Sequence, residues 1–222
     1  MDLRRLSGVG NMDGHEEDWP IRIAALGVLG VLAASAAVAQ IQDTRPLNPR
    51  DLRPVASFSA IADQGERSRA LFNEIAKVIT HPRCMNCHPA GDQPLQDTDH
   101  RIHFPPARRA GLGDSCAACH TNRNVTLHVA ASFQSVPGHP RWALAPLSMV
   151  WEGKSLGEIC RQIKDTDRNG GRDLALLHEH IAKEDLVAWG WKPGAGREPA
   201  PGSQDIAGQL TKAWIDSGAE CP

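Results

Sequence analysis

The stretch RCMNCHPAGD (residues 83–92) decides the fold, because its Cys-x-x-Cys-His pattern returns 32 residues later in DSCAACHTNR (residues 114–123). Thiols can add across the two vinyl groups of a haem, and two intervening residues form a turn that presents both sulfurs to one porphyrin edge. The adjacent histidine then points at the iron, so this pattern is the attachment signal of a c-type haem. The sequence therefore predicts two covalent haems, held by Cys84, Cys87 and His88 and by Cys116, Cys119 and His120.

Other interpretations of Cys-x-x-Cys fit less well. A thioredoxin-like redox site would need a surrounding βαβ pattern, and none flanks either motif. A structural zinc ion held by the four cysteines would leave both histidines unexplained, and it suits an exported chain less well. Haem is therefore the prediction, and zinc is the alternative.

The composition predicts a mainly α, loop-rich fold. The 222 residues include 16 prolines and 20 glycines, but only 4 phenylalanines and no tyrosine. So much proline and glycine indicates extensive loops, and so few large aromatic rings leave little to fill a core. A haem is a large apolar disc whose burial would supply that area. We therefore expect residues 67–222 to form a compact dihaem cytochrome c domain built around two covalently attached haems.

Residues 1–39 have the features of a signal peptide. Arg22 is followed by a 17-residue apolar run, IAALGVLGVLAASAAVA, which ends in the small residues that a signal peptidase needs. Cleavage after Ala39 would deliver the protein to the periplasm. The alternative is an uncleaved anchor, which would keep the protein at the membrane. Residues 40–66 are rich in proline and charge and are expected to form an extended N-terminal arm.

The charge balance of the mature chain excludes one class of partner. The whole sequence has 24 basic and 26 acidic side chains; removing the leader's three arginines and five carboxylates leaves 21 of each. A formally neutral protein has no basic field with which to hold nucleic acid, so we expect no nucleic-acid partner.

Apolar periodicity predicts several helices. Leu71, Ile75, Val78 and Ile79 share one helical face, with Glu74 and other charged residues expected on the remaining faces. Further helices are expected over residues 155–164, 173–182 and 204–217, with loops over 89–115, 121–153 and 189–203. Little of the chain indicates strand.

Two cysteines lie outside the paired motifs. In an oxidising compartment two spare cysteines usually bond to each other, so we expect a Cys160–Cys221 disulfide. The alternative is a pair of buried free thiols.

Each haem iron also needs a ligand on the face opposite its motif histidine, and methionine or histidine is the usual choice. Met149 lies in a proline-bounded apolar loop, and His103 lies in the rigid stretch IHFPP. His180 is expected on the apolar face of its helix. We therefore favour Met149, His180 and His103 as additional iron ligands. The other candidates are Met85, His81, His100, His128, His139 and His178.

Long strings of this chain resemble a family of small c-type cytochromes, the cytochrome subunit of isoquinoline 1-oxidoreductase, a molybdenum hydroxylase. The similar strings cover most of residues 68–222: HPRCMNCHPAGDQPLQ, VPGHPRWALAP, EICRQIKD, NGGRDLALLHEHI, LVAWGWKPGAGREPAPG and KAWIDSGAECP. Where the family carries a histidine after the tryptophan of PRW, this chain has Ala143, which leaves Met149 the better ligand candidate in that loop. The resemblance implies a molybdenum hydroxylase as the upstream redox partner.

The prediction for function is therefore a periplasmic dihaem electron carrier that is not itself an enzyme. It would take electrons from a molybdenum-hydroxylase-type dehydrogenase and pass them to a downstream cytochrome or oxidase of the respiratory chain. The alternative is a haem enzyme, such as a dihaem peroxidase or a sulfur-compound dehydrogenase. That would require an open iron site with an acid–base group beside it, for which Glu152 and Glu179 are candidates. A haem-based sensor is a weaker third possibility.

Overall fold

The computed structural model describes residues 48, 50–109, 116–129 and 132–222. The leader predicted for residues 1–39 lies outside the described residues, as does the first part of the arm. Within the described ranges, no helix combines the length and the apolar character that crossing a membrane requires.

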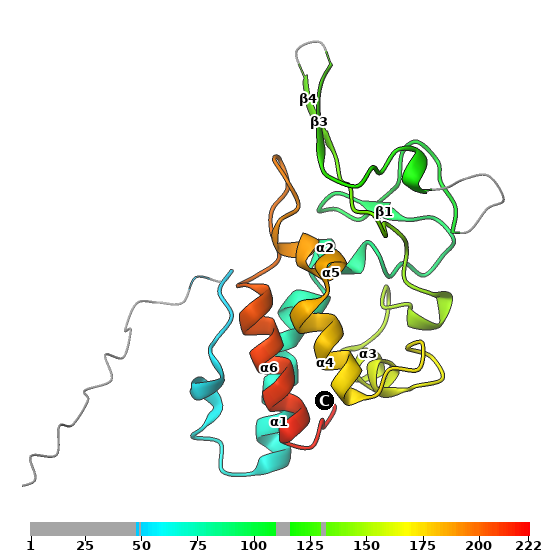
Figure 1. Ribbon diagram of the computed structural model, residues 1–222. Helices are drawn as coiled ribbons and strands as arrows, with labels where there is room; N and C mark the ends of the chain where they lie inside the picture. The colour runs from blue at the N-terminus through cyan, green and yellow to red at the C-terminus, as the bar shows by residue number, and fades with distance from the viewer. Residues whose placement is uncertain (1–47, 49, 110–115, 130–131) are drawn as a thin grey trace, which may run out of the picture. The chain divides into compact units, whose positions relative to one another are not determined.

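Helices α1 (Gln64–Ile79), α4 (Leu174–Lys183) and α6 (Gln204–Asp216) form the packed centre of the folded unit, and α6 contacts both of the others (Figure 1). Phe72 of α1 and Trp214 of α6 are each 1% exposed, and their ring centroids lie 5.2 Å apart. These two helices therefore pack through aromatic side chains, although the chain has few of them.

The α4–α6 contact depends on a glycine. A Cβ atom placed on Gly208 would lie 2.6 Å from the Cβ of Ala182. That distance is shorter than two side-chain carbons can approach, so the absence of a side chain at Gly208 lets the helices lie this close.

The arm predicted for residues 40–66 is partly wrong. Its described portion packs against the helices: Leu52 is 3% exposed and Phe58 is 1% exposed. Phe58 ends a short 3₁₀ helix, η1 (Val55–Phe58), and α1 already begins at Gln64 with Asp63 as its N-cap. The prolines and charges of this stretch suggested a free linker, but a few well-placed apolar residues anchor it.

The sequence pattern predicted Glu74 on a face of the helix other than the buried one, and this prediction is wrong. Its side chain is 1% exposed, and it accepts hydrogen bonds from Arg53 Nε at 2.8 Å and Lys77 Nζ at 2.6 Å. The backbone N–H of Arg53 donates to it as well. Burial raises the pKa of Glu74, but these donors outweigh it and leave the pKa below its usual value. The buried carboxylate thus ties the arm to α1.

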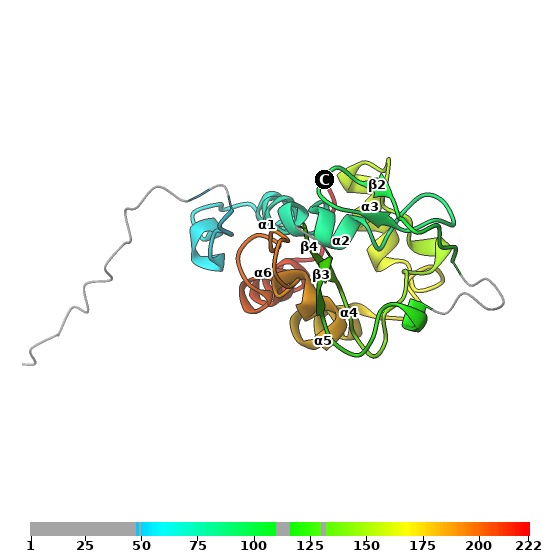
Figure 2. The same ribbon diagram turned by 90° about the horizontal axis from the view of Figure 1, so that it is seen from above.

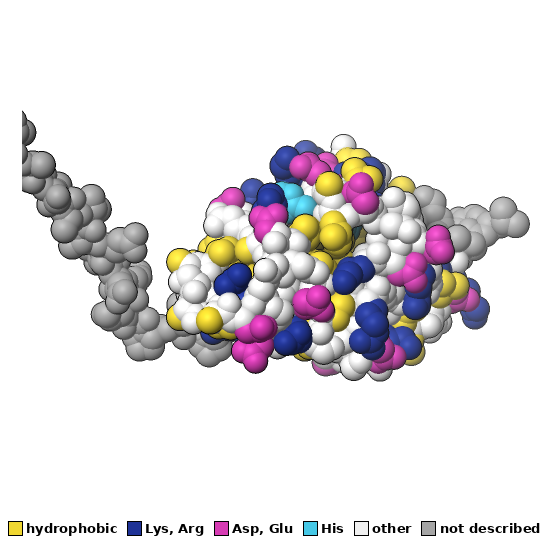
Figure 3. Space-filling model, turned by 90° about the horizontal axis from the view of Figure 1, so that it is seen from below, with side chains coloured by type: hydrophobic (Ala, Val, Ile, Leu, Met, Phe, Trp, Pro, Cys, Tyr) yellow, Lys and Arg dark blue, Asp and Glu magenta, His cyan; other side chains and the backbone are white. Residues whose placement is uncertain are grey.

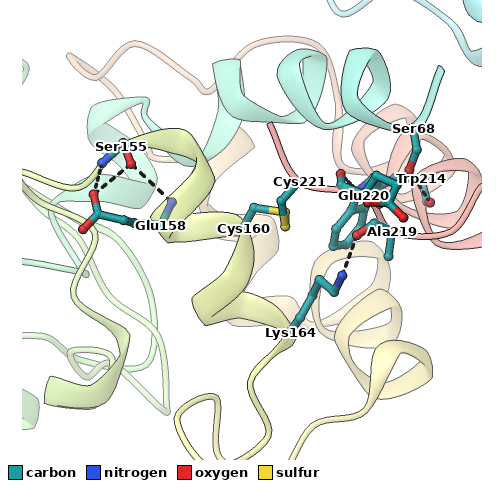
Figure 4. Close-up of a disulfide and its surroundings, with 9 residues drawn as sticks. All are labelled: Ser68, Ser155, Glu158, Cys160, Lys164, Trp214, Ala219, Glu220 and Cys221. Atoms are coloured by element: carbon teal, nitrogen blue, oxygen red, sulfur yellow. Dashed lines mark hydrogen bonds between the residues drawn. A yellow bond between two sulfur atoms is a disulfide. The ribbon is translucent and has the colours of Figure 1, made fainter. Parts of the chain in front are cut away.

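The predicted disulfide is confirmed. Cys160 in α3 (Leu156–Lys164) is fully buried and bonds to Cys221, with their Cα atoms 5.6 Å apart (Figure 4). Two hydrogen bonds hold the same C-terminal segment: Lys164 Nζ donates to the Ala219 carbonyl, and Trp214 Nε1 donates to the Glu220 carbonyl. The end of the chain is therefore fixed to both α3 and α6.

The remaining short elements lie in the loop-rich part of the unit. They comprise α2 (Pro82–Met85), β1 (Leu95–Gln96), β2 (Arg101–Ile102), η2 (Cys116–Ala118), β3 (Val125–Val129), β4 (Ser132–Val136), η3 (Leu147–Met149), α5 (Asp185–Ala188) and η4 (Trp189–Trp191). The mainly α, loop-rich prediction is confirmed for the described residues.

Little of the described chain is strand, as expected, but the loop predicted over residues 121–153 needs a correction. Strands β3 and β4 pair antiparallel with Val125 opposite Val136, and this hairpin projects from the rest of the unit in Figure 1 and overlies its middle in the view of Figure 2. The apolar residues Val125, Leu127 and Val129 alternate along the chain and were the available signal. Surrounding prolines and glycines led that stretch to be interpreted as loop.

The surface carries both signs of charge. On the face shown in Figure 3, basic and acidic side chains are interspersed, and neither sign forms a continuous field there. That distribution agrees with the neutral balance of the mature sequence.

Candidate functional site

The first Cys-x-x-Cys-His motif forms a tight turn directly after α1. His81 caps α2, since its Nδ1 accepts a hydrogen bond from the backbone N–H two residues on. The chain leaves α2 in a further turn, in which the Cys87 N–H donates to the Cys84 carbonyl at 3.1 Å. His88 follows at once, so the two thiols and the imidazole emerge from one short turn.

His88 is held by two groups from a distant part of the chain. Its Nδ1 donates to the Met149 backbone carbonyl at 2.6 Å, and the indole of Trp151 stacks on its ring at 3.5 Å and 2°. Burial lowers the pKa of His88 to about 4, so the imidazole is neutral at physiological pH. With Nδ1 donating to a carbonyl, Nε2 carries the free lone pair that a metal requires.

The second motif repeats this arrangement with different residues. His120 follows η2, and its Nδ1 donates to the Pro137 carbonyl at 2.7 Å. The indole of Trp142 stacks on it at 5.0 Å and 17°. Burial lowers the pKa of His120 too. Burial thus disfavours the protonated form of both motif histidines, and a backbone carbonyl orients each of them through Nδ1.

A single segment supplies every one of these supporting groups. Residues 137–151, which we call the bridging segment, orient His120 from their first part and His88 from their last part. Between them, the Ala145 N–H donates to the Cys87 carbonyl at 3.0 Å. Sequence reasoning missed this role, because a backbone carbonyl leaves no mark on the side-chain pattern.

The thiols of the first motif lie in an apolar environment. Burial raises the pKa of Cys84 to about 12 and that of Cys87 to about 11, so both thiols are protonated when nothing is bound to them. A thioether carries no charge and suits such a buried position. The charge of Arg83 lowers the pKa of Cys87 against the effect of burial, and the nearby Cys116 raises it further. That influence shows that the two motifs lie close together.

Met149 lies next to the histidine of the first motif. Its carbonyl contacts Nδ1, whereas a metal would bind Nε2 on the opposite edge of the ring. Met149 thus presents its backbone carbonyl, and not its sulfur, to the Nδ1 edge of His88, so its choice as an iron ligand gains no support at this histidine. Its 8% exposed side chain belongs to the apolar core instead.

His180 acts electrostatically on the first motif. After the larger effect of burial, charge repulsion from His180 lowers the pKa of His88. The Nδ1 of His180 bonds to a carboxylate oxygen of Glu184, one helical turn on, which leaves Nε2 free. Burial is the main cause that lowers the pKa of His180.

His103 lies beside the histidine of the second motif. The two ring centroids are 5.8 Å apart, and His103 Nδ1 donates to the Pro105 carbonyl at 2.8 Å. Two imidazoles that bind one metal from opposite sides, each with a metal–nitrogen bond of about 2 Å, have centroids roughly 6 Å apart. The observed separation of His103 and His120 is close to that value.

The other candidates have different positions. His100 bonds to Asn86 at 2.7 Å, and His139 accepts a hydrogen bond from the Arg141 N–H and contacts Asp185. Met85 lies inside the first motif, His128 lies in β3 and His178 lies in α4.

Several buried donors around the first motif have no hydrogen-bond partner among the described residues. They are Nε1 of Trp151, Nε of Arg83, and Nε and Nη1 of Arg109. Burial lowers the pKa of both guanidinium groups, and Arg109 acts electrostatically on His88. A buried donor without an acceptor costs about 1–3 kcal/mol, so this cluster fits an anionic group beside the first motif, such as the propionates of a haem.

Comparison with known proteins identifies no relative: no family model, curated protein or solved structure matches the chain. Within the described residues, the cysteine, histidine and carboxylate side chains form no group of three or more that could hold a bare metal ion. The interpretation of the site therefore depends on its own geometry.

Proposed function

We propose that this protein is a dihaem c-type cytochrome that carries electrons and leaves catalysis to its partners. The observation that carries the proposal is the repeated orientation of the motif histidines. His88 and His120 each donate Nδ1 to a backbone carbonyl and stack on a tryptophan, which leaves Nε2 for an iron. Such second-shell support is typical of histidines that bind metals.

Bound haem would supply a one-electron iron couple, and the protein would set its potential through ligand type and burial. In this proposal Cys84 and Cys87 hold the first haem and Cys116 and Cys119 hold the second. The partnerless donors of Trp151 and Arg109 support a haem at the first motif, because its propionates would satisfy them.

We further propose histidine as the sixth ligand of both irons, which revises the methionine expected from the sequence. His180 would pair with His88, and His103 would pair with His120. The electrostatic influence of His180 on His88 and the 5.8 Å separation of the ring centroids of His103 and His120 support this choice. Two imidazoles give a lower potential than a histidine–methionine pair.

The proximity of the motifs supports a two-step relay. Cys116 influences the pKa of Cys87, and the bridging segment contacts both motifs, so the proposed haems would lie near each other. One haem would accept an electron and the other would release it. No proton or bond transfer is needed for this role.

The partners and the compartment follow from the resemblance and from the cysteines. A molybdenum hydroxylase would supply the electrons, and a respiratory cytochrome or oxidase would remove them. The Cys160–Cys221 disulfide supports an oxidising location such as the periplasm.

The enzyme alternative gains little support from its two candidate acid–base residues. Glu152 accepts a hydrogen bond from the Ala90 N–H at 2.7 Å, and Glu179 forms an exposed ion pair with Lys183. Each carboxylate already has a structural partner, so we rank the enzyme second.

The first experiment is an intact-mass measurement of protein expressed with a cytochrome c maturation system. We expect the mass of two added haems, and of one haem in the Cys84→Ala/Cys87→Ala and Cys116→Ala/Cys119→Ala variants. A wild-type protein that carries zinc, or no haem at all, would overturn the proposal.

The second experiment tests ligation by EPR of the oxidised protein. Two low-spin haems are expected in the wild type, and His103→Ala should convert one of them to high spin. Met149→Ala serves as the control and should leave both signals low-spin. A high-spin wild-type signal that responds to cyanide or peroxide would favour the enzyme instead.

A further inference from the structure

The residue between α4 and α5 connects the proposed sixth ligand of the first haem to the bridging segment. One carboxylate oxygen of Glu184 bonds to His180 Nδ1, and the other accepts a hydrogen bond from Arg141 Nη1 at 3.3 Å. Glu184 both ends α4 and caps α5, so the backbone fixes its position relative to His180.

The neighbouring charges do not compete for His180. Asp185 accepts from Arg141 and contacts His139 Nε2 at 3.2 Å. The Nδ1 of His139 accepts the Arg141 N–H, so its Nε2 is the protonated nitrogen and donates to Asp185. Asp185 is thus a second carboxylate beside the same guanidinium, without a hydrogen bond to His180 in the described part of the chain.

The Glu184–His180 contact is partly shielded from water. The side chains of His180 and Glu184 are 30% and 28% exposed, whereas that of Asp185 is 69% exposed. Interactions between partly buried charges are screened less than exposed ones. A carboxylate that accepts a hydrogen bond from a ligand imidazole raises the basicity of that imidazole.

We propose that Glu184 is a positioning residue that orients His180 toward the first haem and lowers the potential of that haem alone. The inference rests on the proposed function. An imidazole made more basic favours ferric over ferrous iron, which lowers the potential. Arg141 moderates the effect, because its guanidinium draws negative charge away from the same carboxylate.

The test uses the full-length protein with both haems attached, in a potentiometric titration that resolves two one-electron waves. Loss of a second-shell partner typically changes metal affinity by about 10–100-fold. Even a tenfold loss of preference for the ferric state in Glu184→Gln would raise one wave by about 59 mV. The other wave should not move.

Two variants separate the hydrogen bond from the charge. Asp185→Asn removes the same charge next to the same arginine, so it should shift the wave much less than Glu184→Gln does. Arg141→Gln leaves the Glu184 hydrogen bond in place and should shift the wave downward. The EPR g-values of one low-spin haem should change in Glu184→Gln and stay unchanged in Asp185→Asn.

The wave that belongs to the haem bound by His180 is identified with His180→Met, which should move the same wave that Glu184→Gln moves. Equal shifts in Glu184→Gln and Asp185→Asn, or a shift of the wave that His180→Met leaves unchanged, would overturn the inference. These outcomes are distinct from failure of the proposed function, in which no haem would be attached at all.

Discussion

Removal of the Cys160–Cys221 disulfide should destabilise the protein by an amount that the loop length sets. The bond joins residues 61 apart in the sequence. Chain-entropy reasoning gives about 4 kcal/mol for closing a loop of that size in the unfolded chain. The double variant Cys160→Ala/Cys221→Ala should therefore lose about 4 kcal/mol of unfolding free energy, measured by guanidinium denaturation of the haem-loaded protein followed by far-UV circular dichroism.

Part of the C-terminal attachment would survive this change. Lys164 and Trp214 still donate to the carbonyls of Ala219 and Glu220, so the segment should stay docked in the folded state. The loss should then arise mainly in the unfolded state, and the folded-state spectrum should be unchanged. Reduced wild-type protein is the control and should match the double variant.

A loss below about 1 kcal/mol would refute the reasoning, since it would mean that the cross-link hardly restricts the unfolded chain. An altered folded-state spectrum would refute it in another way. It would show that the sulfurs hold the folded C-terminus in place.

Three further predictions concern the packed helices and the first motif. The pKa of Glu74 lies below 4.5, so its ionised form stabilises the fold above that pH, and this contribution is lost as the pH falls through the folded-state pKa. In urea denaturation, wild type should be more stable than Glu74→Gln by about 1–3 kcal/mol at neutral pH, and this difference should shrink below pH 4.5. A difference that stays constant with pH would contradict the prediction. Gly208→Ala should lower the unfolding free energy by about 1–3 kcal/mol in thermal melts, because the new methyl would meet Ala182 at 2.6 Å; a higher melting temperature would show that helix propensity wins. Trp151→Phe keeps an aromatic ring stacked on His88 and removes the partnerless indole N–H. Both proposed haems should still be attached by mass, while the reduction potential of one of them should fall. Unchanged potentials would exclude that N–H as a hydrogen-bond donor to a propionate.

The long helices could be predicted from the sequence because their signals are local. The disulfide could be predicted because only two cysteines lie outside the motifs. The apolar stripe of α6 and the capped start of α3 specify helices without help from the rest of the chain. The two cysteines outside the motifs could pair only with each other or stay free. In contrast, the arm around Phe58 was misjudged, because its burial depends on contacts with residues far away in the sequence.

The residues of the candidate site also differ in how far the sequence could predict them. The motif spacing points directly to Cys84, Cys87 and His88 and to their counterparts in the second motif. The groups that orient the histidines could not be predicted, because the carbonyls of Pro137 and Met149 act through backbone that any residue has. Met149 was chosen for its sulfur, yet the atom that contacts the site is its carbonyl oxygen.

The bridging segment also limits how the protein could be divided or rebuilt. A cut between the motifs would give an N-terminal fragment that has His88 but lacks the carbonyl and the indole that steady it, since both come from residues 137–151. The N-terminal half is therefore not self-sufficient, because the groups that orient its motif histidine belong to the C-terminal half. Any engineered version has to keep residues 137–151 intact, including the end that contacts His120 and the end that contacts His88.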